Sequence, residues 1–199
     1  MKKFKLFMDI QKEEDWLNGM VKKGWLCKHV SAWGIYDFEK TASAEQVIRI
    51  DYPTFRTSDA KKRYIELYED YGWQHLGGNW LHYWLKPADG RDELFSDHTS
   101  QKAYLRRLLE YYGSIGFVLL VIAFSVLNNG SYSKSLKGAY LTPGLWEKEG
   151  SEFLSAFLFE TPFALMRFGM PWLLLGWGIA FILVYSKYHK KAKELDKTT

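Results

Sequence analysis

Two long apolar stretches that contain no charged residue limit most strongly what this chain can fold into. They cover residues 111–127 (YYGSIGFVLLVIAFSVL) and 169–185 (GMPWLLLGWGIAFILVY). In a helix, about 20 apolar residues cross a hydrocarbon core of roughly 30 Å. Core helices of globular proteins usually place polar residues on a solvent face, and these stretches do not. The pattern predicts a hairpin of two transmembrane helices, and two buried helices of a globular protein are the alternative.

Basic residues gather on the outer flanks of the two stretches, whereas acidic and basic residues are mixed between them. The flanking residues are Lys102, Arg106, Arg107, Lys187, Lys190, Lys191 and Lys193. Short segments rich in Lys and Arg stay on the cytoplasmic side of a membrane. We therefore expect a multi-pass protein of the cell membrane with two spans and with both termini in the cytoplasm. The net charge of +4 arises mostly from these clusters, so it favours a lipid bilayer over nucleic acid as the partner.

The shift from polar to apolar sequence divides the chain into six expected parts. These are a cytosolic α+β domain at 1–87, a linker and juxtamembrane helix at 88–110, the first transmembrane helix at 111–128, an external loop with an interfacial helix at 129–162, the second transmembrane helix at 163–186 and a basic cytosolic tail at 187–199.

Hydrophobic periodicity assigns the elements of the polar part. The expected elements are strands at 3–8, 25–31, 32–38, 45–52, 73–76 and 80–86, with helices at 10–23 and 57–71. This order predicts an antiparallel sheet covered on one face by two helices, which is the ferredoxin-like arrangement with added strands. Both halves show a helix, then Gly-Trp (Gly24-Trp25 and Gly72-Trp73), then a hairpin. A duplication explains this repeat, and so does the use of Gly as a helix stop.

The usual catalytic and cofactor motifs are missing from the sequence. We therefore expect no enzyme, no cofactor and no metal. His29, His75 and His82 fall on different expected strands and could meet across a sheet, with Cys27 or Asp51, to hold a metal. Ordinary strand histidines with local partners are the preferred interpretation.

Aromatic side chains are unusually dense in the polar part. Trp80, His82 and Trp84 alternate onto one face of their expected strand. If the opposite face packs on the helices, this aromatic face is left for a ligand or a partner. The predicted binding residues are Trp33, Trp80, His82 and Trp84. A bulky aromatic core is the alternative.

Six segments resemble a known family. They are residues 14–25 (EDWLNGMVKKGW), 36–39 (YDFE), 47–52 (VIRIDY), 68–73 (YEDYGW), 80–87 (WLHYWLKP) and 93–97 (ELFSD). Over roughly residues 1–110 they resemble the DUF2812 proteins of Firmicutes. The resemblance implies a bacterial membrane protein often encoded beside PadR-like transcription regulators. That family has no assigned activity, so no catalytic residue is carried over.

These observations favour a membrane-anchored regulatory or sensory accessory protein. Its cytosolic domain is expected to bind a protein partner or a small ligand and to act with a PadR-like transcription regulator. The sequence leaves open whether the protein forms a homo-oligomer. The alternative is a membrane-stress or toxic-peptide resistance protein that acts through its spans and outer loop. A third hypothesis is an enzyme that uses the region of His29, His75, His82 and Asp51.

Overall fold

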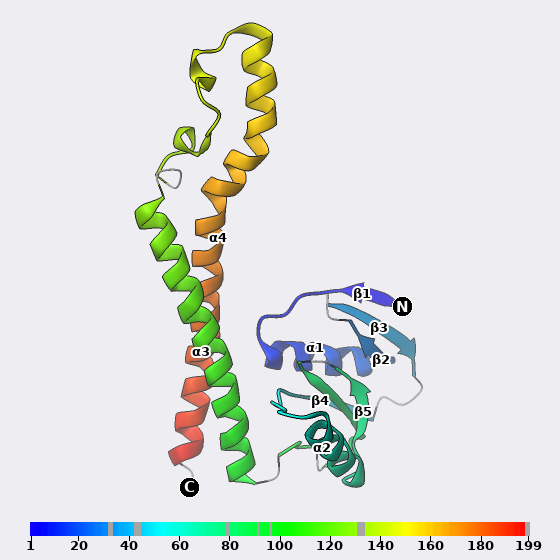
Figure 1. The fold of residues 1–199 in the computed structure, drawn as a ribbon. Coiled ribbons are helices and arrows are strands. Elements are labelled where there is room, and N and C mark those ends of the chain that lie inside the picture. Colours follow the sequence, from blue (N-terminus) through cyan, green and yellow to red (C-terminus); the bar gives the residue numbers. More distant parts are fainter. Residues whose placement is uncertain are drawn as a thin grey trace. The chain divides into compact units, whose positions relative to one another are not determined.

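The computed structural model divides into two compact units, which are described separately. It describes residues 1–31, 34–41, 45–78, 80–90, 92–95, 97–130 and 134–197. The first unit comprises Met1–Leu108 and Tyr188–Thr199, and the second comprises Leu109–Lys187. Figure 1 shows the elements of both units along the chain.

The first unit is an α+β structure with antiparallel sheets, as the sequence predicts. Its elements are β1 (Lys2–Phe4), α1 (Ile10–Val21), β2 (Trp25–Val30), β3 (Ile35–Lys40), β4 (Gln46–Asp51), α2 (Ser58–Asp70), β5 (Gln74–Gly77) and β6 (His82–Pro87). The described strands form two three-stranded sheets, with the orders β1-β3-β2 and β4-β6-β5, where the sequence pattern predicts one sheet.

Both sheets have the same topology. In the first, β1 and β2 pair antiparallel with β3 on either side, and α1 connects them. In the second, β4 and β5 flank β6 in the same way, and α2 connects them. Each half is therefore a split β-α-β unit followed by a central strand. The repeat noted in the sequence is thus a repeat of topology, and Gly24 and Gly72 both follow their helices at positive φ, 78° and 81°.

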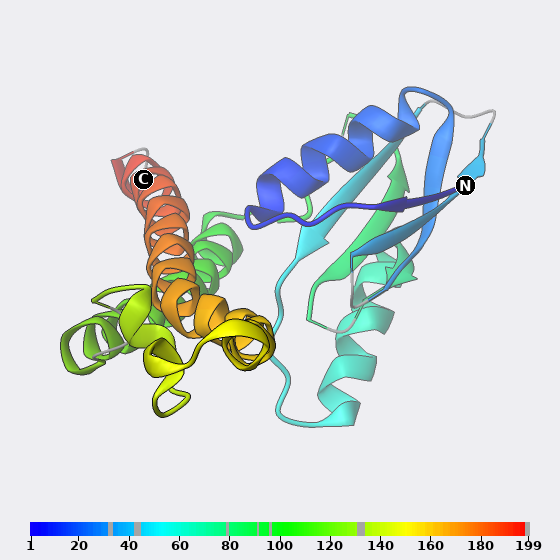
Figure 2. The same cartoon turned by 90° about the horizontal axis from the view of Figure 1, so that it is seen from above.

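The two helices reach opposite faces of β6 rather than the same face. Tyr83 donates to a carboxylate on α1, whereas Trp84 donates to Tyr64 on α2. Figures 1 and 2 agree in placing α1 and α2 on either side of the second sheet. Because successive strand residues point in opposite directions, β6 is covered on both faces.

Helix α1 pairs with the free edge of β4. The Asn18 side chain accepts from the Ile48 amide (2.7 Å) and donates to the Ile48 carbonyl (2.9 Å). The Glu14 carboxylate accepts from the Ile50 amide (2.9 Å). Ile48 and Ile50 are buried, so water cannot replace these bonds. Side chains of a helix thus take the place of a fourth strand at this edge.

A buried carboxylate on α1 joins the two sheets. Glu13 accepts from the Tyr36 hydroxyl of β3 (2.7 Å) and from the Tyr83 hydroxyl of β6 (2.6 Å). Burial raises the pKa of Glu13, and the two hydroxyl donors act against that rise. One helix therefore holds both halves of the first unit together.

The second unit contains most of the two long helices. These are α3 (His98–Asn129) and α4 (Gly150–Lys197), both long and apolar enough to cross a membrane by length and composition. Between them lie the short 3-10 helices η2 (Lys137–Ala139) and η3 (Leu145–Glu147). The expected interfacial helix near 151–159 is not separate, because α4 runs on through Pro162 and Pro171. Figure 1 shows α4 changing direction in its yellow-to-orange part, as prolines inside a helix favour.

Glycines allow α3 and α4 to approach closely within the second unit. A Cβ added at Gly178 would lie 2.9 Å from the Leu120 side chain, and one added at Gly116 would lie 2.9 Å from Ile182. Small residues at such crossings are typical of membrane helix pairs. Gly176, by contrast, has no atom within 4 Å of such a Cβ.

The two members of an ion pair within α4 also bind the connecting segment. Arg167 donates to the Glu160 carboxylate and to the Ala139 carbonyl (2.9 Å). Glu160 also accepts from the Thr142 hydroxyl (2.8 Å). These bonds give the segment after α3 a fixed attachment despite its lack of long elements.

We expect Asn18→Leu to destabilise the first unit by about 3 kcal/mol. The change removes two hydrogen bonds and leaves the buried Ile48 amide unpaired, at a cost of about 1–3 kcal/mol, while the Ile48 carbonyl keeps only its contact with Arg49 (3.3 Å). Urea unfolding of the full chain in a mild detergent, followed by tryptophan fluorescence, measures this. Asp15→Leu is the control, because Asp15 is exposed on the same helix. An equal loss in both variants would contradict the edge-pairing role.

We expect Gly178→Leu to destabilise the second unit by about 2 kcal/mol, because the new side chain overlaps Leu120. Gly176→Leu should change stability by less than about 0.5 kcal/mol, since its surroundings are open. Detergent-dependent unfolding followed by circular dichroism compares the two. If both variants behave alike, close packing at Gly178 is not what holds the helices.

Candidate functional site

The residues predicted to bind a ligand or partner have very different surroundings. Trp80 is 74% exposed, whereas His82 and Trp84 are fully buried. Tyr64 and Tyr68 of α2 cover them: Trp84 donates to the Tyr64 hydroxyl (3.3 Å), and the Tyr68 and Trp84 rings lie 4.9 Å apart. Trp33 lies outside the described residues. The expected aromatic face is therefore covered at His82 and Trp84, and the binding role of these residues stays a prediction.

Two of the three candidate histidines meet. The Nε2 of His75 and the Nδ1 of His82 lie 2.9 Å apart, and their rings are stacked. His29 is exposed on β2. Within the described ranges, no group of three or more His, Cys, Asp or Glu side chains could hold a metal.

His82 is held neutral by its environment. Its Nε2 is buried without a hydrogen-bond partner among the described residues. Burial, together with the smaller effects of the neighbouring His75 and Lys61, lowers the pKa of His82 to about 4. The pair thus joins the buried His82 to the half-buried His75.

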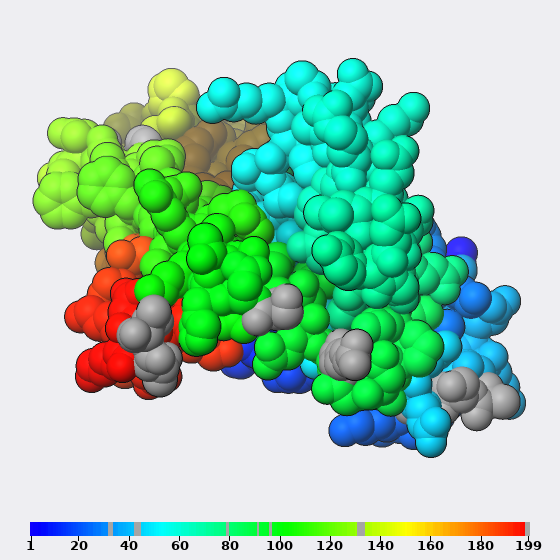
Figure 3. Space-filling model, turned by 90° about the horizontal axis from the view of Figure 1, so that it is seen from below, coloured from blue at the N-terminus to red at the C-terminus, as the bar shows by residue number. Residues whose placement is uncertain are grey.

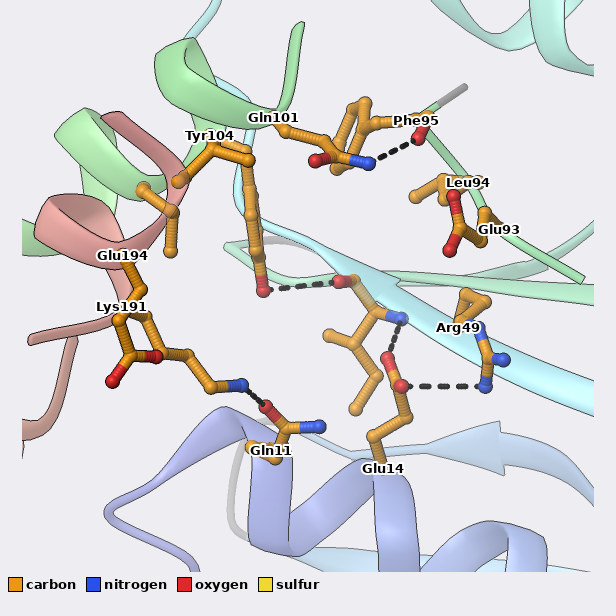
Figure 4. Close-up of a pocket in the computed structure, with 13 residues that line it drawn as sticks. Gln11, Glu14, Arg49, Glu93, Leu94, Phe95, Gln101, Tyr104, Lys191 and Glu194 are labelled. Atoms are coloured by element: carbon orange, nitrogen blue, oxygen red, sulfur yellow. Dashed lines mark hydrogen bonds and ion pairs between the residues drawn. The ribbon is translucent and has the colours of Figure 1, made fainter. Parts of the chain in front are cut away.

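The first unit contains a cavity of about 510 Å³. Five segments line it: α1, β4, the connection before α3, the first turns of α3 and the last turns of α4 (Figure 4). Its described lining consists of Gln11, Glu14, Arg49, Ile50, Glu93, Leu94, Phe95, Gln101, Tyr104, Leu105, Lys191, Glu194 and Leu195. Cavities of this size accept small organic molecules.

One wall of the cavity is a fixed ion pair. The Arg49 guanidinium lies 3.3 Å from the Glu14 carboxylate and donates through Nε to the Asp92 carbonyl (2.7 Å). Burial raises the pKa of Glu14, while the Ile50 amide and Arg49 favour its charged form. The same carboxylate that pairs with the edge of β4 therefore also faces the cavity.

The last turns of α4 are attached beside α1. The Tyr188 hydroxyl donates to Asp9, the N-cap of α1 (2.7 Å), and accepts from the Gln11 amide (3.2 Å). Lys191 donates to the Gln11 side chain. These bonds position Lys191 and Glu194 at the cavity.

The first turns of α3 are attached to β4. Arg107 pairs with the buried Asp51 (3.1 Å) and donates to the Tyr52 carbonyl (2.9 Å). Asp51 also accepts from the Tyr64 hydroxyl (2.7 Å). Lys102 of α3 pairs with Asp196 of α4 (2.9 Å), and Figure 3 shows these green and red turns side by side.

The described lining combines apolar surface with charged groups and carries no His, Cys or Ser. Such a lining suits the binding of an amphipathic molecule. Sequence reasoning missed it, because its residues come from five separate segments. The one sequence feature that pointed to this region is that Glu14 and Asn18, one helical turn apart, are polar residues on the side of the helix that faces the sheet.

Comparison with known proteins finds one family. The family model described as "Protein of unknown function (DUF2812)" matches residues 9–117, more than half of the chain. No curated protein and no solved structure matches. The match includes α1, β4 and the first turns of α3, and so much of the cavity.

We expect the contribution of His82 to lower the stability of the first unit as the pH falls from about 6.5 to about 4. The folded-state pKa of His82, about 4, lies below its ordinary value of 6.5, so the unfolded chain binds more protons in this range. The loss reaches about 3 kcal/mol at most. Urea unfolding at several pH values measures it.

His82→Phe keeps a ring in the aromatic cluster and should flatten this pH dependence. His29→Phe, at an exposed position, serves as the control and should retain it. A pH profile unchanged by His82→Phe would show that other groups cause the acid sensitivity.

Proposed function

Because the chain belongs to the DUF2812 family, whose description assigns no activity, we propose its function from its own cavity. It is a membrane-anchored sensory accessory protein whose N-terminal α+β unit binds a small amphipathic ligand. The observation that carries this proposal is the cavity of about 510 Å³, with apolar walls and a few fixed charged groups.

The membrane anchor is the pair α3 and α4, which support membrane localisation by length and composition. We propose that both chain termini lie in the cytoplasm, because Lys and Arg cluster on the outer flanks of the two apolar stretches. Each half of the first unit alone is proposed to be related to the ferredoxin-like fold, because each sheet contains the split β-α-β connection of that fold.

A sensor needs a readout, and the cavity wall offers one. Tyr104 and Leu105 belong to the first turns of α3, and Lys191 and Glu194 belong to the last turns of α4. A ligand that contacts these turns stabilises one arrangement of them over others. The proposed receiver of this signal is a PadR-like transcription regulator, which the family resemblance implies as a genetic neighbour.

We expect Leu105→Trp, which fills the cavity, to reproduce the effect of deleting the gene on transcription of the neighbouring genes. Ile35→Trp is the control, because Ile35 is 41% exposed on β3 and does not line the cavity. A transcriptional reporter measures both variants in the native host. The neighbouring regulator should also be recovered with the wild-type protein from membranes in mild detergent.

If deletion leaves neighbouring transcription unchanged and no regulator is recovered, the proposed sensory role is wrong. If deletion acts but Leu105→Trp does not, the protein regulates without using this cavity.

A further inference from the structure

The charges around the cavity point to a class of ligand. Resting on the proposed ligand-binding function, we infer that the cavity takes an organic cation with an apolar body. We further infer that Lys191 is an internal cation that such a ligand displaces. Three carboxylates and two cationic groups are present in the described lining.

Arg49 does not compete for this role, because its charge is already offset. Its guanidinium pairs with Glu14 at 3.3 Å and donates to the backbone carbonyls of Asp92 (2.7 Å) and Ile48 (3.3 Å). A group held by a carboxylate and two carbonyls is a fixed part of the wall. An anionic ligand that approached Arg49 would also meet the Glu14 carboxylate, which repels it.

Lys191 is held less firmly. Its ammonium donates to the neutral side-chain amide of Gln11, and no ion pair with it occurs among the described residues. Figure 4 shows the Lys191 side chain reaching from α4 toward Gln11 at the edge of the cavity. A long, exposed lysine with an amide partner is displaced at little cost, because water and other acceptors replace that bond.

One carboxylate of the lining is open to a ligand cation. Glu93 is exposed, and no described residue pairs with it. Glu194 lies three residues after Lys191 on α4 and also lines the cavity. An ammonium group that replaces that of Lys191 would donate to the Gln11 side-chain oxygen and lie near the same carboxylates.

The apolar body has a matching surface. The rings of Phe95 and Tyr104 lie 5.1 Å apart, and Leu94, Leu105 and Leu195 complete the apolar lining. Burial of an apolar group against them supplies affinity, and the cationic head supplies orientation. Displacement of Lys191 removes one of the bonds that attach the last turns of α4 to α1, which links occupancy to that attachment.

Three compounds with one body test the charge requirement: 4-phenylbutylamine, 4-phenyl-1-butanol and 4-phenylbutyrate. Calorimetric titration into the full chain in lipid nanodiscs, with empty nanodiscs subtracted, measures their affinities. We expect the amine to bind about tenfold more tightly than the alcohol, as a charge-assisted contact provides. The carboxylate should bind most weakly.

Two pairs of variants test the residues. Lys191→Met should strengthen binding of the amine about fivefold by removing the internal competitor, whereas Lys193→Met makes the same charge change on the same helix outside the described lining. Glu93→Gln should weaken binding of the amine about fivefold, and Glu66→Gln on α2 is the control for this variant. Both control variants should bind as the wild type does.

The outcomes separate the two proposals. Equal binding of the three compounds, or preference for the carboxylate, overturns the cation inference and leaves a ligand-binding cavity. Binding by none of them overturns both. Equal effects of Lys191→Met and Lys193→Met overturn the displacement of Lys191, because they would reflect only the total charge of the tail.

Discussion

The first unit depends on how helix α1 meets the edge of β4. An edge strand presents unpaired amides and carbonyls, and burying them without partners costs more than any single contact contributes. Asn18 and Glu14 satisfy these groups at Ile48 and Ile50. This requirement sets both the position and the rotation of α1. One turn of the helix earlier or later would leave the edge unpaired.

The contact between α1 and β4 also determines which α1 side chains line the cavity. With α1 fixed on β4, its first turn presents Asp9 and Gln11 to the end of α4, and Glu14 faces the cavity from the same helix. Glu13, the neighbour of Glu14, points the other way and joins the two sheets through Tyr36 and Tyr83. Consecutive acidic residues thus have separate tasks, because successive helix positions lie about 100° apart.

Local patterns predicted much of this structure. Both helices of the first unit and its strand hairpins follow from periodicity and from Gly24 and Gly72 as stops, and the two long helices follow from the uncharged apolar stretches. The division into two sheets could not be predicted, since it depends on which edges pair. The burial of Trp84 could not either: alternation marks a face of β6 but cannot say that helices cover both faces. The cavity was hidden because no single segment contains more than three of its lining residues.

The position of the cavity on α3 and α4 determines how a ligand could act. Each helix is continuous from its cavity-lining turns into its apolar stretch, and neither Gly nor Pro occurs at 98–112 or at 179–197. Sharp kinks in helices arise mainly at such residues or at local insertions. The helix turns that carry Tyr104 and Lys191 therefore have no Gly or Pro hinge nearby. A ligand that moves Tyr104 or Lys191 is therefore expected to shift the whole helix end. The bonds of Tyr188 to Asp9 and of Arg107 to the Tyr52 carbonyl oppose such a shift.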